Sequence, residues 1–383
     1  MITREIAQAH YPSRPLGDVA DFLDNRRKPV KKIDRIPGPY PYYGANGQQG
    51  TINGYLFDEP LLLLAEDGGL FDEPDRGIAY RVSGKTWVNN HAHVIRPKNG
   101  LDMGFLYRTL ENYDVRPYIN GSTRSKLTKT QASQIVIPLP PLKEQKRIAA
   151  ILDQADALRA ARQRALDKLN TLGQSIFYDM FGDELKHCTH GETIHEYVKF
   201  ITSGGRGWAK YYAPTGARFI RSLDVQMNRI GSDDVVYVAP PKNAEARRTK
   251  INKRDVLLTI TGSKIGRVAV APEDIEGAYI SQHVAIIRLD LEKINPIFLS
   301  FYLSLEEGGQ RQIRKLQYGQ AKPGLNFEQI RSFEMPKIDI VDQIAFCARL
   351  YEVNGLNSKL EKGLAEQSQF FASLQQRAFR GEL

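Results

Sequence analysis

An internal duplication constrains the fold of this chain more than any other feature of its sequence. Four residues recur with the same identity 198 positions later (336 − 138 = 198): Leu127 and Leu325, Gln131 and Gln329, Pro138 and Pro336, Gln145 and Gln343. A repeat of this length has the size of a domain, whereas solenoid repeats have about 20 to 50 residues. The sequence therefore predicts one structural unit that is used twice.

The two halves also align, with gaps, ahead of these positions. Leu16-Gly-Asp-Val19 corresponds to Ile194-His-Glu-Tyr197, and the segment that contains His91 corresponds to the segment that contains His283. The stretches between these segments differ in length and in residue type. This pattern indicates a shared scaffold that carries different loops, with the two histidines in structural positions on strands.

A long helix of about 40 residues is predicted after each shared proline, on the order of 60 Å long. The first such stretch has neither Pro nor Gly from Leu142 to Leu172. Apolar residues recur in both stretches at alternating spacings of four and three, a pattern typical of helices that pair with other helices. The predicted seam consists of Ile148, Leu152, Leu166, Leu169 and Ile176 in the first helix and Phe346, Leu350, Leu360, Leu364, Phe371 and Leu374 in the second.

The economical interpretation is that the two helices pair with each other, antiparallel, as a coiled coil. The alternative is that each helix packs on its own globular domain. The seam is polar near its middle, at Arg159, Arg162 and Asn357. These residues either set the alignment of the helices or lie on the surface where the seam drifts away from the contact.

Both globular halves are predicted to be mixed α and β structure. Examples are strands at Val235–Val238, Asp255–Ile260 and Val284–Leu289 and helices at Met103–Leu110 and Pro296–Leu305. The predicted fold is α/β (α+β), with two globular domains joined by two long antiparallel helices in a pseudo-two-fold repeat. The domains are expected at residues 1–140 and 184–340, and the helices at 141–183 and 341–383.

Three segments carry a family resemblance, namely the run from Ile135 to Ile148, Ser175-Ile-Phe-Tyr-Asp-Met-Phe-Gly-Asp183 and the final Leu374–Leu383. Together with Leu16-Gly-Asp-Val19, Tyr42-Tyr-Gly44 and the duplication, they resemble the specificity subunits of Type I restriction–modification systems. The resemblance covers essentially the whole chain. One departure is Lys337-Ile-Asp-Ile340, which replaces the Pro-Pro of the first half and weakens the expectation that both halves bind partners equally.

The resemblance implies a DNA-reading role without catalysis. Each globular half would be a target-recognition domain for one part of a split double-stranded DNA sequence. The helices would act as a spacer and would dock two methyltransferase subunits, and restriction subunits would then join the complex.

The charge of the chain agrees with DNA as a partner. The formal net charge is +9 and the pI is about 9.3, and the excess of Lys and Arg lies in the two globular segments. A phosphate-binding surface has this distribution, although many soluble proteins are mildly basic. With two cysteines, no apolar run of about 18 residues and no secretory signal, we expect a cytoplasmic protein without a membrane segment.

DNA contact is predicted for loop residues that combine hydrogen-bonding groups, cations and small neighbours. Matching loops precede the two helices, with Ser122, Thr123, Arg124 and Lys126 in the first and Gln320 and Lys322 in the second. Other candidates are Tyr42, Tyr43, Asn46 and Gln48 in the first half and Arg206, Trp208, Lys210, Tyr211, Lys264 and Arg267 in the second. Any one of them can be an ordinary loop residue, but the set favours contact. The basic run Arg26, Arg27, Lys28, Lys31 and Lys32 either binds phosphates or is simply solvated.

Other chemistries find no support in the sequence. Thr261-Gly-Ser-Lys-Ile-Gly lacks the spacing of a phosphate-binding loop, and no methyltransferase or nuclease motif is present. His187-Cys188-Thr-His190 lacks the second ligand pair of a zinc module, so neither a metal nor a cofactor is expected. The remaining alternatives are a stand-alone DNA-binding protein and a helical adaptor.

Overall fold

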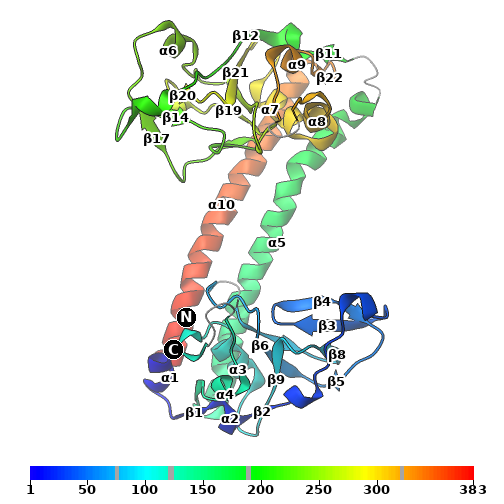
Figure 1. Cartoon of the computed structure of the whole chain (residues 1–383), viewed down its shortest axis with the longest axis vertical. Helices are drawn as coiled ribbons and strands as arrows, with labels where there is room; N and C mark the ends of the chain where they lie inside the picture. Colours follow the sequence, from blue (N-terminus) through cyan, green and yellow to red (C-terminus); the bar gives the residue numbers. More distant parts are fainter. Residues whose placement is uncertain (74–76, 120–124, 187–190, 320–322) are drawn as a thin grey trace. The chain divides into compact units, whose positions relative to one another are not determined.

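The computed structural model describes residues 1–73, 77–119, 125–186, 191–319 and 323–383, and they form two compact units (Figure 1). The first unit contains Met1–Ala165 together with Leu360–Leu383, and the second contains Leu166–Lys359. Each unit therefore holds one globular domain, part of the helix that follows it and part of the other long helix. The mixed α and β architecture with two domains joined by long helices is confirmed.

The globular domain of the first unit is built on two four-stranded sheets. The first sheet has the order β2 (Ala20–Phe22), β9 (Ala92–Pro97), β6 (Leu61–Ala65) and β7 (Ala79–Val82). The second has the order β4 (Gly47–Ile52), β3 (Tyr40–Gly44), β8 (Lys85–Val88) and β5 (Phe57–Asp58). Smaller elements are α1 (Arg4–Gln8), β1 (Ser13–Pro15), α2 (Leu16–Val19), α3 (Met103–Leu110), α4 (Lys129–Ala132) and β10 (Val136–Pro138).

The second unit repeats the order of the first sheet and the parallel pair of the second sheet, while the fourth strand of its second sheet lies at the opposite edge. Its first sheet has the order β12 (Val198–Ser203), β21 (Val284–Leu289), β18 (Val256–Thr259) and β19 (Val268–Val270). Its second has the order β13 (Tyr212–Ala213), β17 (Val236–Val238), β14 (Ala217–Ile220) and β20 (Tyr279–Ile280). Its other strands and short α-helices are β11 (Glu192–Thr193), β15 (Val225–Gln226), β16 (Arg229–Ile230), α6 (Ala244–Arg248), α7 (Pro296–Ser304), α8 (Arg311–Leu316), α9 (Phe327–Arg331) and β22 (Glu334–Met335).

The central strand of each first sheet is buried on both faces, which explains its unbroken apolar sequence. Leu62 and Leu64 of β6 pack into the core that contains α3 and the long helices, while Leu61 and Leu63 face the second sheet. In the other unit Leu258 and Leu257 of β18 divide in the same way. Each globular domain thus consists of three layers, a helix layer and two sheets.

The two long helices are α5 (Leu142–Lys186) and α10 (Ile340–Phe379), and they begin at equivalent positions of the repeat (340 − 142 = 198). The carbonyl oxygen of Pro141 accepts hydrogen bonds from Glu144 N (2.8 Å) and Gln145 N (3.0 Å). The carbonyl oxygen of Asp339 accepts from Asp342 N (3.0 Å) and Gln343 N (3.1 Å). The second long helix therefore begins with the same hydrogen bonds as the first, although its sequence lacks the Pro-Pro pair.

Within each unit the N-terminal part of one long helix runs antiparallel to the C-terminal part of the other. In the first unit the guanidinium of Arg159 lies 4.6 Å from the Phe371 ring, and in the second Asn357 Nδ2 donates to Asn170 Oδ1 at 3.4 Å. All the predicted seam residues are buried or half-buried. Arg159 and Asn357 lie in this contact, which favours the first of the two interpretations of the polar middle.

The ends of the long helices also belong to the domain cores, so both interpretations of the apolar seam hold in part. Ile148 and Leu152 share the core of the first unit with α3, as does Phe379, whose ring centroid lies 5.5 Å from that of Phe105. In the second unit Phe177, which the heptad pattern missed, is fully buried and contacts Phe346 at 5.3 Å. The coiled coil and the domains therefore form continuous cores within each unit.

A buried glutamine joins each long helix to the short helix beneath it. Gln145 Oε1 accepts from Asp102 N at 2.8 Å, and Gln343 Oε1 accepts from Asn295 N at 2.8 Å. Asp102 and Asn295 are the N-caps of α3 and α7. The Nε2 group of each glutamine donates back to a carbonyl just before its own helix, Pro140 O (2.9 Å) or Ile338 O (2.9 Å). Gln145 and Gln343, two of the residues that revealed the repeat, thus have a structural role at the start of each long helix.

Replacing Gln343 with Ala should destabilise the second unit by about 1–3 kcal/mol, because Asn295 N and Ile338 O would lose their buried partner. Thermal unfolding of the full chain should show a lower midpoint for the transition that involves this unit. Gln376→Ala, an exposed position on α10, is the matched control. Equal midpoints for Gln343→Ala and the control would contradict the structural role of this side chain.

Candidate nucleic-acid interface

Each domain has a cleft at the same place in the repeated topology. In the first domain β3 and β8 pair in parallel and Asn89 N donates to Tyr43 O (3.0 Å). In the second domain β14 and β20 pair in parallel and Ser281 N donates to Ile220 O (2.9 Å). The chain then turns into β9 or β21 through a histidine, His91 or His283. Both histidines line the clefts.

The cleft of the first domain has a volume of about 400 Å³ and a polar wall. Side-chain amides of this wall bind their neighbours: Asn46 Nδ2 donates to Gly68 O (2.9 Å), and Asn89 Nδ2 donates to Gln49 Oε1 (3.3 Å). The cations of the wall are Lys31 and Arg35. Amides can bind base edges bidentately and cations can bind phosphates, so this wall has the groups that DNA recognition requires.

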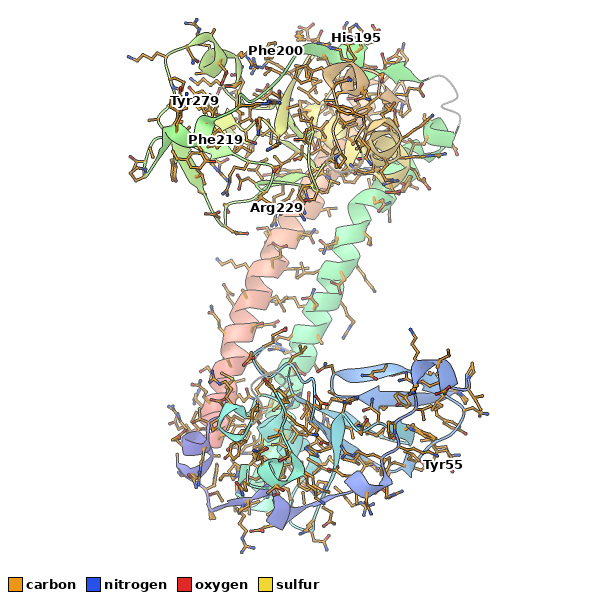
Figure 2. The ribbon with its side chains drawn as sticks, in the orientation of Figure 1. Tyr55, His195, Phe200, Phe219, Arg229 and Tyr279 are labelled. Atoms are coloured by element: carbon orange, nitrogen blue, oxygen red, sulfur yellow. The ribbon has the colours of Figure 1, made fainter. Side chains whose placement is uncertain are left out.

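The cleft of the second domain has a volume of about 330 Å³ and an aromatic wall. Trp208 stacks on Phe219 with ring centroids 5.6 Å apart and lies 5.3 Å from Tyr279; Figure 2 labels the latter two residues. Arg221 and Gln282 supply polar groups to the same wall. Equivalent clefts therefore have different linings, as expected of sites that read different sequences.

Each cleft adjoins the segment that leads to the long helix. Asp67 forms a β-bridge with Lys126, and Thr261 forms a β-bridge with Gly324. Lys126 and Gly324 are equivalent positions of the repeat (324 − 126 = 198). Asp67 and Thr261 also face the cleft histidines. The His91 Nδ1 atom lies 3.5 Å from the Asp67 carboxylate, whereas His283 Nδ1 contacts the Thr261 hydroxyl.

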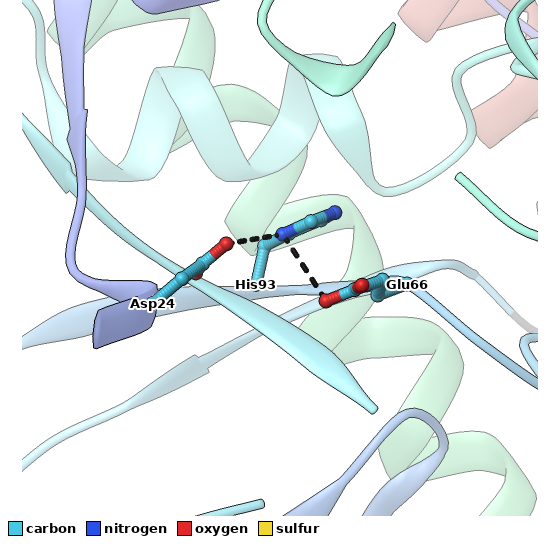
Figure 3. Close-up of side chains that lie close together, drawn as sticks. All are labelled: Asp24, Glu66 and His93. Carbon is cyan, nitrogen blue, oxygen red and sulfur yellow. Dashed lines mark hydrogen bonds and ion pairs between the residues drawn. The ribbon is translucent and has the colours of Figure 1, made fainter. Parts of the chain in front are cut away.

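A buried ionic cluster lies beneath the first of these segments (Figure 3). His93 Nδ1 lies 2.7 Å from Asp24 Oδ2, and His93 Nε2 lies 2.8 Å from Leu127 O. Both partners are acceptors, so both ring nitrogens must carry a proton to satisfy the two contacts. Burial raises the pKa of Asp24, but the hydrogen bond and charge of His93, together with Arg27, outweigh it and lower this pKa below its ordinary value.

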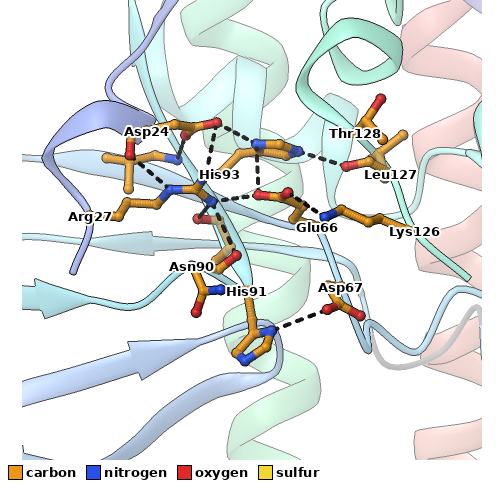
Figure 4. Close-up of polar contacts among 12 residues, drawn as sticks. Asp24, Arg27, Glu66, Asp67, Asn90, His91, His93, Lys126, Leu127 and Thr128 are labelled. Atoms are coloured by element: carbon orange, nitrogen blue, oxygen red, sulfur yellow. Dashed lines mark hydrogen bonds and ion pairs between the residues drawn. The ribbon is translucent and has the colours of Figure 1, made fainter. Parts of the chain in front are cut away.

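Two further cations complete the cluster (Figure 4). Arg27 lies 2.6 Å from the Glu66 carboxylate and 3.4 Å from Asp24, and Lys126 Nζ lies 3.3 Å from Glu66. Asp24, Glu66 and His93 are the only residues in the described ranges grouped closely enough to hold a metal ion. Their charges already meet Arg27 and Lys126, so this geometry fits an ion-pair network that holds Leu127 in place and does not support a metal site.

The comparisons with known proteins agree with this picture. A family model described as "Type I restriction modification DNA specificity domain" matches residues 10–171. The first domain and the greater part of α5 therefore match this DNA specificity domain. The second domain lies outside that match, but its first sheet has the same strand order as the first sheet of the matched domain.

Similar curated proteins match different shares of the chain. A putative type I restriction enzyme specificity subunit of Haemophilus influenzae is 45% identical over 38% of this chain and 37% of its own length. The EcoBI specificity subunit of Escherichia coli is 25% identical over 73% and 65%, so the chain covers less than two thirds of both proteins. The MjaVIII specificity subunit of Methanocaldococcus jannaschii is 22% identical over 89% of this chain and 85% of the relative.

Solved structures share the fold of this chain. The S subunit of the Type-I restriction-modification system from M. genitalium has a TM-score of 0.63 at 14% identity, covering 97% of this chain and 96% of that one. A chain from work on complex assembly and conformational transition of the type I R-M system has a TM-score of 0.57 at 16% identity, covering 98% of both. In the described part of the sequence, no helix combines the length and apolarity that crossing a membrane requires.

Two of the predicted DNA contacts, Tyr42 and Trp208, need correction, because their side chains are buried. The Tyr42 hydroxyl accepts from Val30 N (3.0 Å) and donates to Val30 O (3.2 Å). Trp208 lies beneath its cleft, and its indole N–H donates to the Glu245 carboxylate. Both side chains shape a cleft wall instead of presenting a polar group to DNA.

The other predicted contacts remain predictions. Asn46, Gln48, Lys126, Arg206, Lys210 and Lys264 are exposed, and Tyr43, Tyr211 and Arg267 are half-buried. Ser122, Thr123, Arg124, Gln320 and Lys322 lie outside the described residues, as does the His187–His190 stretch. Sequence reasoning missed the role of the cleft histidines. Their shared place in the repeat was visible, but nothing in the sequence placed them beside a cleft.

Replacing Asp24 with Asn should destabilise the first unit by on the order of 3 kcal/mol at neutral pH, because a buried cation would lose its partner. The folded-state pKa of Asp24 is lowered, so its stabilisation is complete above the unfolded value of about 4 and is lost as the pH falls through the folded value.

The measurement is the difference in unfolding midpoint between the wild type and Asp24→Asn from about pH 7 to about pH 2.5. The difference should shrink in acid. Asp21→Asn, which removes an exposed carboxylate of the same strand region, is the control. A difference between wild type and Asp24→Asn that does not change with pH would contradict an ionised Asp24 in the cluster.

Proposed function

We propose that this chain is the sequence-specific DNA-recognition subunit of a Type I restriction–modification complex. Each globular domain reads one part of a bipartite target through its cleft and the adjacent segment before the long helix. The observation that carries the proposal is the pair of equivalent clefts with different linings, one rich in amides and one aromatic. The described residues form no catalytic arrangement in either cleft, and we assign methylation and cleavage to partner subunits.

The long helices supply the spacer and the docking sites in this proposal. Both helices expose several large apolar residues, and two of those on α5 recur as exposed apolar residues at the equivalent positions of α10 (356 − 158 = 198; 370 − 172 = 198). They are Leu158 and Leu172 on α5 and Leu356 and Phe370 on α10. Leu158 and Phe370 belong to the first unit, Leu172 and Leu356 to the second.

These exposed residues form one pair in each unit. Leu158 and Phe370 are the chain neighbours of Arg159 and Phe371, which contact each other across the helix pair. Leu172 and Leu356 likewise adjoin Gly173 and Asn357 of the seam. An exposed apolar pair that recurs in both units fits two copies of one partner, which we assign as the methyltransferase subunit.

A helical adaptor without a DNA-reading role is the second candidate. It would account for the exposed apolar pairs on the helices. It gives no reason for clefts with different linings at equivalent places in both domains, and it requires no basic excess on those domains. DNA reading accounts for both observations.

DNA binding by the chain assembled with its methyltransferase subunit tests the proposal. The complex should prefer its target over random DNA by roughly a thousandfold or more, and affinity should fall steeply as salt rises. Gln282→Ala should weaken target binding by roughly tenfold to a hundredfold and relax discrimination in one half-site only. Gln369→Ala, exposed on α10, is the control. An assembled complex without sequence preference would overturn the proposed function.

Charged substitutions in the exposed pairs test the docking sites. In the double variant Leu158→Asp and Phe370→Asp, the number of bound methyltransferase subunits should fall from two to one, because a carboxylate cannot be buried against an apolar partner surface without a large cost. Light scattering of the purified complex counts the subunits. Gln369→Asp alters the same helix outside the pair, and a stoichiometry of two in the double variant would sink this assignment.

A further inference from the structure

The segment from Lys28 to Ile36 presents an apolar side chain to solvent in a cationic setting. Ile33 is 91% exposed, more than any other large apolar residue in the described ranges, and Ile36 is 66% exposed. Ile33 sits in a short 3-10 turn, Lys32–Asp34. Two isoleucines this exposed within one short segment give it an apolar tip that a partner surface can cover.

The base of this segment is fixed to the domain. The indole N–H of Trp87 donates to Lys28 O (2.7 Å), and Val30 is bonded through both its backbone groups to the buried Tyr42 hydroxyl. The Arg35 guanidinium lies 3.8 Å from the Tyr42 ring and donates to Val30 O at 3.2 Å. The turn that carries Ile33 is therefore held between two anchored points, and the exposure of Ile33 is a property of the fold.

The charges around Ile33 indicate what kind of surface it meets. Lys28, Lys31 and Lys32 are exposed, and none of them has an ion-pair partner within the part of the chain that the structure describes. Lys31 and Arg35 also line the cleft of the first domain. Ile33 lies between Lys32 and the exposed Asp34, with Lys31 and Arg35 beyond them. An apolar tip in this net basic segment, continuous with a polar cleft, complements a surface that combines phosphates with apolar base faces.

We propose that Ile33 inserts as a wedge into a base step of the DNA minor groove beside the half-site read by the first domain. Lys31 and Lys32 neutralise the flanking phosphates. Insertion partly unstacks the step and bends the duplex, which brings the adjacent bases toward the cleft. This inference rests on the proposed DNA-reading function and adds the way in which the first domain deforms its target.

The test uses the complete chain with its methyltransferase subunit and a target duplex labelled with a fluorophore at each end. Energy transfer measures the bend, and titration measures the affinity. Ile33→Ala should lower the affinity roughly tenfold and reduce the bend, while Ile33→Leu should retain both. Ile297→Ala, an exposed isoleucine of the second domain, should behave as the wild type. Because Ile33 packs against little, its replacement should leave the unfolding midpoint unchanged.

Unchanged affinity and bend in Ile33→Ala, with a smaller salt dependence in Lys31→Ala and Lys32→Ala, would overturn the wedge and leave a backbone contact. Loss of methyltransferase binding in Ile33→Ala would also overturn it, because the partner of this tip would then be a protein. If the wild-type complex shows no sequence preference at all, the proposed function fails instead. The two failures are thus distinguishable.

Discussion

The junction between each long helix and its globular domain is the constraint on which the rest of the structure depends. A helix of 45 residues such as α5 can define a direction only if its start is fixed. The buried carboxamides of Gln145 and Gln343 fix it, because each bonds the capped start of α3 or α7 and the chain just before its own helix. A spacer role requires such a junction, since a loosely attached helix would not hold two reading sites in register.

Around this shared junction, different interactions stabilise the two copies of the repeat. In the first unit the buried Arg108 bonds Asp153 Oδ1 (2.8 Å) and Glu111 Oε2 (2.8 Å) and lies 5.6 Å from the Phe371 ring. The equivalent place in the second unit holds Phe301, which packs against Phe346 with ring centroids 5.0 Å apart.

Neighbouring positions of the repeat have changed in concert with this exchange. Phe371 corresponds to Gly173 (371 − 173 = 198), and a Cβ atom at Gly173 would lie 3.4 Å from the Phe301 ring. Asp153 corresponds to Tyr351. An ionic cluster in the first unit and aromatic packing in the second thus occupy equivalent places. Each of them requires matching residues at the neighbouring positions. The duplicated scaffold has tolerated divergence even at its centre.

Much of this architecture could be predicted from the sequence because it depends on short-range patterns. Spacing by 198 revealed the repeat, and α3 was predicted with its observed bounds because Asp102 caps a short amphipathic run. The heptad pattern could not show that Phe177 belongs to a domain core, since that depends on which distant helix covers it.

The candidate site was less accessible to sequence reasoning for the same physical reason. Tyr42 and Trp208 are residue types that often bind ligands, but tertiary packing buries both side chains. The cluster of Asp24, Glu66 and His93 joins three segments far apart in the chain, and no local pattern announces it. Clefts arise from how loops meet above a sheet, so only the shared histidine positions hinted at their place.

The central claim is that one scaffold, used twice, reads a target in two parts. The most direct test is the DNA motif methylated in cells that contain this chain and its methyltransferase subunit, determined by single-molecule sequencing against cells without the chain. The account predicts two different short specific sequences separated by a fixed number of unspecified base pairs. A single uninterrupted motif, or no methylation that depends on the chain, would contradict it.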